Sequence, residues 1–217
     1  MFTLPTFNVT KYRVEGTKRY QEQEVIDSLG LKPNENIFKQ MLFSLNYKSN
    51  LAYIAKVDLK FSLPNETIIN VSERTSKYFA FDKEKNKFYK VSKDGEILEE
   101  SNIDSKTKEE LLTYGITFND EVKMGEQIND TDMAKIATYE KISKQYTQSS
   151  IKGDITKVSF ENSLTTITIN DKLNIILPND TNLKYNMTFL QGIIKNIGES
   201  SVGVIDMTKT NPTFSSF

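Results

Sequence analysis

Residues 55–74 read AKVDLKFSLPNETIINVSER. Apolar side chains occupy alternate positions on both sides of Pro64 and Asn65, which break the run. Alternation with a period of two is typical of a β-strand with one buried face, and the Pro-Asn break indicates a turn between two such strands. The segment therefore predicts a β-hairpin. Because an isolated hairpin is not stable in water, its apolar face must be covered by other elements.

Two amphipathic segments that precede the hairpin are suited to cover it. Residues 21–29 place apolar side chains at helical spacing, and Gly30 follows as a helix-ending residue. A second helix is expected to begin at an Asn36 cap and to direct one apolar stripe at the sheet, formed by Ile37, Phe38, Met41, Leu42 and Leu45. Apolar and polar residues also alternate over residues 7–16, which predicts a further strand. The expected order is strand, helix, helix, strand, strand.

Beyond Arg74 the pattern changes to short strands and turns, which indicates a domain boundary close to residue 75. One helix is expected over residues 107–112, where Thr107 and Glu110 have capping-box spacing. A second helix is expected after a cap at Asp130 or Thr131, and a third over residues 183–197. Strands are expected over residues 77–81, 87–92, 96–99, 155–160, 164–169, 173–177 and 202–207. The sequence thus predicts an α+β fold, with a small module followed by a mixed β domain with flanking helices.

The strand over residues 202–207 is the last regular element that the sequence predicts. As the final strand it is a candidate sheet edge, whose unpaired N–H and C=O groups can bind a partner by strand addition. The alternative is that it lies inside the sheet or beneath the residues that follow, and the pattern favours neither arrangement. Phe214 and Phe217 lie in the polar stretch beyond it and are candidates for contacts with a partner.

Composition narrows the classes of function. The 217 residues include 28 basic and 29 acidic side chains, with a net charge of -1 and no basic cluster. Nucleic acid and anionic membrane surfaces are therefore poor partners. Cysteine and histidine are absent, which removes thiolate metal sites, cysteine nucleophiles and the commonest general base. We expect neither a cofactor nor a metal site.

Sequence motifs for catalysis are weak. Ser105 and Lys108, like Ser149 and Lys152, have the Ser-x-x-Lys spacing of penicillin-binding enzymes, but the accompanying Ser-Asp-Asn and Lys-Thr-Gly elements are missing. Residues 130–132 read like the beginning of a calcium loop, without the glycine and glutamate at the required spacing. The sequence predicts a protein that is not an enzyme.

Five segments carry a family resemblance by their order and spacing. They are FNVTKYRVEG, EVIDSLGLKPNENIF, the hairpin ending in INVSER, YKVSKDGEILEE and GVIDM, and they extend over nearly the whole chain. The chain resembles the extracytoplasmic part of the bacterial cell-division family called FtsQ or DivIB. Residues 1–74 are similar to its POTRA domain and residues 75–207 to its β domain, followed by a C-terminal tail over residues 208–217. The chain departs from the family pattern at Ser76 and at residues 113–116, where members often carry a proline.

The resemblance implies a single-pass membrane protein, with an anchor before Phe2 and this region on the extracytoplasmic side at the division septum. It implies a scaffold without enzymatic activity or cofactor, which binds the division proteins DivIC (FtsB) and FtsL and helps to control septal peptidoglycan synthesis. The POTRA domain would contact other divisome components. The main alternative is a POTRA-bearing docking or chaperone module of a transport or assembly system, for which tandem repeats are expected and none is visible in the sequence.

The resemblance also implies where the partner binds. In the family, the partner adds a strand near the C-terminal end of the β domain. Carried over to this sequence, the partner-binding residues are Val204, Ile205, Asp206, Met207, Thr208, Lys209 and Phe214.

Overall fold

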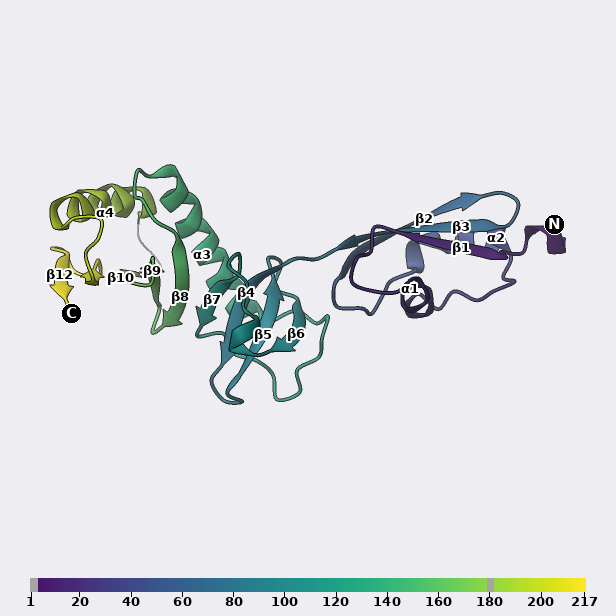
Figure 1. Cartoon of the computed structure of the whole chain (residues 1–217), viewed down its shortest axis with the longest axis horizontal. Coiled ribbons are helices and arrows are strands. Elements are labelled where there is room, and N and C mark those ends of the chain that lie inside the picture. The colour runs from purple at the N-terminus through teal and green to yellow at the C-terminus, as the bar shows by residue number, and fades with distance from the viewer. Residues whose placement is uncertain (1–3, 179–181) are drawn as a thin grey trace. The chain divides into compact units, whose positions relative to one another are not determined.

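A computed structural model describes residues 4–178 and 182–217 (Figure 1). The chain divides into two compact units. The first contains the described residues up to Thr75 together with Lys123–Glu126, and the second contains Ser76–Val122 and Gln127–Phe217. Each unit has its own hydrophobic cluster. The predicted α+β class is confirmed, because a small helix and sheet module precedes a large mixed sheet with flanking helices.

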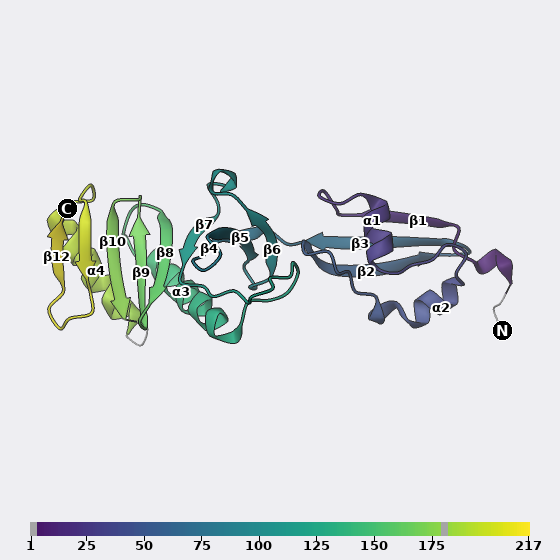
Figure 2. The same cartoon turned by 90° about the horizontal axis from the view of Figure 1, so that it is seen from below.

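The first unit has the predicted order of strand, helix, helix, strand and strand (Figure 2). β3 lies in the middle of the sheet, where it pairs in parallel with β1 and in antiparallel with β2. Apolar side chains of α1 pack on the sheet together with Ile69 and Val71 of the hairpin. The elements are η1 (Pro5–Phe7), β1 (Lys11–Glu15), α1 (Glu22–Ser28), α2 (Ile37–Leu42), η2 (Ser44–Asn46), β2 (Ile54–Ser62) and β3 (Glu66–Glu73).

The predicted apolar stripe of α2 is wrong. Asn36 caps the helix as expected and Ile37 is buried, but Met41, Leu42 and Leu45 are 42%, 78% and 93% exposed. The helix ends at Leu42, so that the residues after it leave the face that packs on the sheet. The second residue that α2 buries is Gln40, which is fully enclosed.

Gln40 is buried because its amide is hydrogen-bonded on both sides. Its Nε2 donates to the Tyr12 hydroxyl at 2.6 Å, and its Oε1 accepts from the Thr67 hydroxyl at 2.9 Å. Buried polar groups are tolerated when such partners are present. The network connects α2 to one outer strand and to the central strand of the sheet, since Tyr12 belongs to β1 and Thr67 to β3.

The second unit is built on a sheet of nine strands among the described residues, in the order β12-β11-β10-β9-β8-β7-β4-β5-β6. Three neighbouring strands, β4, β7 and β8, run in parallel, as do β10 and β11. The elements are β4 (Ser76–Asp82), β5 (Lys87–Ser92), β6 (Ile97–Ser101), η3 (Ile103–Ser105), β7 (Leu111–Tyr114), α3 (Asp130–Gln148), β8 (Ile155–Glu161), β9 (Leu164–Ile169), β10 (Leu173–Pro178), α4 (Leu183–Ile197), β11 (Gly203–Asp206) and β12 (Thr213–Ser216).

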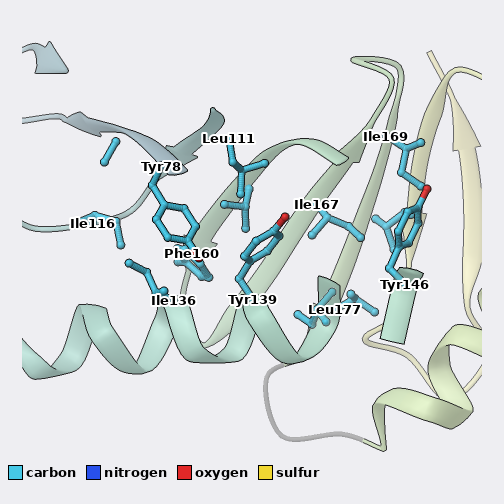
Figure 3. Packing of buried hydrophobic residues seen from close by; sticks show 14 of the residues in the cluster. Tyr78, Leu111, Ile116, Ile136, Tyr139, Tyr146, Phe160, Ile167, Ile169 and Leu177 are labelled. Carbon is cyan, nitrogen blue, oxygen red and sulfur yellow. The ribbon is translucent and has the colours of Figure 1, made fainter. Parts of the chain in front are cut away.

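Both long helices pack on one face of this sheet. The residues that α3 buries include Ile136, Tyr139 and Tyr146, and Figure 3 shows their side chains directed at the strands. Residues Met187, Leu190 and Ile194 of α4 belong to the same cluster. The two helices predicted from the sequence are therefore present, although the cap of α3 is Asn129 rather than Asp130 or Thr131, and Phe189, expected on the apolar face of α4, is 41% exposed.

The predicted helix over residues 107–112 is wrong. The Glu110 side chain does accept a hydrogen bond from the Thr107 N–H at 2.8 Å, as in a capping box. The chain nevertheless enters strand β7, which pairs with β4 on one side and β8 on the other. Non-local pairing and the burial of Leu111 thus override the local signal.

Candidate protein-docking edge

The strand that the sequence offers as a candidate sheet edge is not an edge. β11 pairs in parallel with β10 and in antiparallel with β12. The polar stretch beyond Met207 turns back and adds β12 as the terminal strand of the sheet. Of the two arrangements left open by the sequence, the one in which the following residues cover the strand is correct.

β12 is the outermost strand at this end of the sheet. Its register places Phe214 opposite Ile205 and Ser215 opposite Val204. Among the residues that the structure describes, β12 has β11 as its one strand partner. A terminal strand presents a row of N–H and C=O groups on its outer side, which can pair with an added strand.

The close approach of β11 and β12 depends on Gly203. A Cβ atom at this position would lie 2.2 Å from the Ser215 carbonyl oxygen, a distance that real Cβ atoms do not reach. Gly203 is therefore required where the two backbones meet. Neither Gly203 nor Ser215 carries a signal in the sequence that would predict this contact.

A short hydrogen-bonded turn leads from β11 towards β12. The Asp206 Oδ1 accepts hydrogen bonds from the Thr208 hydroxyl at 2.6 Å and from the Thr208 N–H at 2.9 Å. Lys209 Nζ lies 3.4 Å from the other carboxylate oxygen. These hydrogen bonds from Thr208, with a smaller contribution from Lys209, hold the pKa of the Asp206 carboxyl below its usual value.

The residues predicted to bind a partner fall into three groups. The side chains of Ile205 and Met207 are buried in the core of the second unit, with 0% and 6% exposed. Those of Val204, Asp206 and Phe214 are half-buried, and Phe214 packs against the same core. Thr208 and Lys209 are exposed, in the turn. The structure thus brings the predicted residues together around the β11–β12 pair, but it exposes few of their side chains.

Aromatic side chains add exposed apolar surface to this unit. Tyr185 and Phe189 of α4 are 65% and 41% exposed, and their rings stack with centroids 6.3 Å apart. Phe217, directly after β12, is 82% exposed. α4 follows β10 and precedes β11 in the chain.

Neither a metal centre nor a membrane-crossing helix is found in residues 4–178 and 182–217. No three acidic, histidine or cysteine side chains in these ranges gather closely enough to hold a metal ion. The helices of the same ranges are too short or too polar to cross a bilayer.

The first unit is similar to a known domain family. Residues 7–74 match the model of the FtsQ-type POTRA domain. This range covers the strand, helix, helix, strand, strand module of the first unit. The chain is thus a protein with an FtsQ-type POTRA domain.

Its relatives are cell-division proteins. The chain is 34% identical over 101 residues to cell division protein DivIB of Clostridium tetani. The matched residues cover 45% of this chain and 37% of the relative. For DivIB of Clostridium acetobutylicum the identity is 34% over 100 residues, covering 44% and 38%. For DivIB of Clostridium botulinum it is 28% over 133 residues, covering 59% and 49%. The chain is thus similar to DivIB proteins, and its matches span less than half the length of these relatives.

Proposed function

We propose that this chain is the extracytoplasmic part of a divisome scaffold that binds DivIC/FtsB-like and FtsL-like division proteins and has no enzymatic activity. Through these partners it would help to control septal peptidoglycan synthesis at the cell membrane. The FtsQ-type POTRA domain and the similarity to DivIB support a role in cell division. In this proposal the POTRA domain ends near residue 74, and the β domain that follows includes β12.

The docking mode that we propose is strand addition at the outer edge of β12. The observation that carries it is the place of β12 at the end of the sheet. Main-chain hydrogen bonds of an added strand would supply affinity, each contributing about 0.5–1.5 kcal/mol. Because β12 has four residues, exposed side chains such as Tyr185 and Phe217 would supply further contact area.

The opposite edge of the sheet is less suited to accept a strand. β6 carries Glu99 and Glu100, and these carboxylates form ion pairs with Lys90 and Lys87 of β5 at 3.1 and 2.8 Å. Charged side chains on an edge strand oppose the addition of another strand. The sequence of β12, Thr-Phe-Ser-Ser, has no charged residue. The contrast favours β12 as the docking edge.

A second contact is proposed for the first unit. Met41, Leu42 and Leu45 form an exposed apolar segment at the end of α2 and in η2. Large exposed apolar side chains of this kind are typical of surfaces that bind other proteins. We assign to this segment the contacts with other divisome components that the POTRA domain would make.

Proline substitutions test the docking edge. Adjacent residues of a strand direct their N–H groups to opposite sides, so that one of Phe214 and Ser215 has an N–H on the outer edge. Of F214P and S215P, the variant that removes the outward N–H is expected to weaken binding to the paired DivIC and FtsL ectodomains by about tenfold or more, since proline has no N–H to donate. The measurement is calorimetric titration of the purified chain, with thermal unfolding of each variant to assess the fold.

The matched control is proline on the opposite edge. E100P alters β6 and should leave the dissociation constant unchanged. Equal affinity for F214P, S215P and the unsubstituted chain would refute docking on β12 and would favour contacts through residues 41–45.

A further inference from the structure

Three parallel strands end side by side in the second unit. β7 lies between β4 and β8, and the register pairs Ala80 with Thr113 and Tyr114 with Ser159. The carboxyl ends of the strands are Asp82, Tyr114 and Glu161. In open sheets, ligands bind in the space beyond the carboxyl ends of parallel strands. The space beyond these strand ends is therefore a candidate binding site that is separate from β12.

A cavity of about 440 Å³ lies at these strand ends. Its lining includes Phe81, Asp82 and Glu84 from β4 and the turn after it, Tyr114 from β7, and Phe160 and Glu161 from β8. The rings of Phe81 and Tyr114 pack with centroids 5.6 Å apart. Cavities of this size with aromatic walls and a few polar groups are typical of binding sites.

The charges around the cavity are mostly negative. Three carboxylates, those of Asp82, Glu84 and Glu161, line it together with one lysine, Lys83. Glu84 and Glu161 are exposed, whereas Asp82 is buried, with 5% of its side chain exposed. With Lys85, whose Nζ lies 3.8 Å from Asp82 Oδ2, the carboxylates outnumber the lysines by one, and this excess favours a cationic ligand over an anion.

Asp82 is incompletely satisfied. Its Oδ1 accepts hydrogen bonds from the N–H groups of Glu84 at 3.0 Å and Lys85 at 3.3 Å. Its Oδ2 has no hydrogen bond. Lys85 Nζ forms an ion pair with this oxygen at 3.8 Å and donates a hydrogen bond to the Asn119 carbonyl. A buried carboxylate oxygen without a hydrogen bond increases the negative potential of its surroundings.

We infer that this cavity binds a lysine or arginine side chain presented by a segment of another protein. Aromatic rings attract a cation that lies over their faces, and the half-buried rings of Phe81 and Tyr114 belong to the lining. Phe160 is directed into the core instead. The carboxylates of Glu84 and Glu161 on either side would pair with the charge. Because the cavity has more room than one side chain needs, residues next to the basic one would also contact it. The inference does not depend on the docking mode of β12.

Titration of the isotope-labelled full chain with short capped peptides tests the site by nuclear magnetic resonance. The probe is acetyl-Ala-Lys-Ala-amide, and the control is the same peptide with norleucine, which keeps the apolar stem and lacks the charge. We expect the lysine peptide to shift the amide signals of residues 82–84, 114–117 and 159–161, and to bind about tenfold more tightly than the norleucine peptide.

Charge-neutral variants separate this site from general attraction to an acidic surface. The double variant E84Q/E161Q should weaken binding of the lysine peptide by about tenfold, whereas E109Q, which neutralises an exposed carboxylate outside the lining, should leave it unchanged. Equal binding of the norleucine peptide, or shifts outside the named residues, would overturn the inference. Cadaverine that binds as tightly as the peptide would show a site for small amines and would overturn the assignment to a protein segment.

Discussion

Replacing Gly115 with alanine is expected to destabilise the second unit by about 3 kcal/mol. Gly115 follows β7 directly and has a φ of +81°, a region that side chains strain. A Cβ atom there would lie 2.1 Å from the Phe160 carbonyl oxygen and 3.0 Å from its carbonyl carbon. Since both atoms belong to the backbone of β8, the clash is relieved by moving a strand and not by rotating a side chain.

The surroundings of Gly115 prevent the loop from moving away. Its carbonyl oxygen accepts a hydrogen bond from Lys135 Nζ at 2.6 Å, and the Thr117 N–H donates to Asp132 at 2.9 Å. Asp132 and Lys135 both belong to α3, so a shift of the loop would break its contacts with the helix. The expected loss therefore combines strain with broken hydrogen bonds.

A second glycine provides the matched control. Gly192 is exposed in the middle of α4, and a Cβ atom built there has nothing within 4 Å. G192A should stabilise the chain by about 0.5–1 kcal/mol, because glycine is a poor helix former. Chemical denaturation of both variants measures the two changes. A G115A variant as stable as the unsubstituted chain would contradict the packing described for β7 and β8.

Removing residues 213–217 is expected to weaken binding to the paired DivIC and FtsL ectodomains by about a hundredfold. The truncation takes away β12, the strand on which the partner would form its main-chain hydrogen bonds. It also separates the two docking models. If β11 were the docking strand, as the resemblance implies through residues 204–209, the truncation would expose its edge and binding would persist or improve.

The truncation is expected to leave the second unit folded. Ile205 and Met207, the buried residues of this region, remain in the truncated chain. The apolar contact that is lost belongs to Phe214, which is half-buried, so that we expect a loss of stability of about 1–2 kcal/mol. E100P on the opposite edge serves as the control, since it leaves β12 and Phe217 in place.

Elements with a strong local pattern are predictable from the sequence. The hairpin over residues 55–74 and the helix Leu183–Ile197 have the expected positions, because alternation and helical spacing report directly on which side chains are buried. The buried face of α3 follows from the same reasoning. In each case the partner of the element need not be known to recognise the element itself.

The remaining features depend on contacts between distant residues. β12 is four residues long and lacks an alternating apolar pattern, and it becomes a strand by pairing with β11. Gln40 replaces an apolar residue at a buried position because Tyr12 and Thr67 provide hydrogen bonds from other strands. The cavity at Asp82 requires three strands to end together. None of these arrangements leaves a local signal in the sequence.

Hydrogen exchange at Thr213–Ser216 tests the proposed docking edge most directly. The amide exchange of these residues is measured in the free chain and in complex with the paired DivIC and FtsL ectodomains. Strand addition predicts that the outward N–H groups of β12 exchange about tenfold or more slowly in the complex, because they become hydrogen-bonded. Unchanged exchange over Thr213–Ser216 in a fully formed complex would contradict docking on this edge.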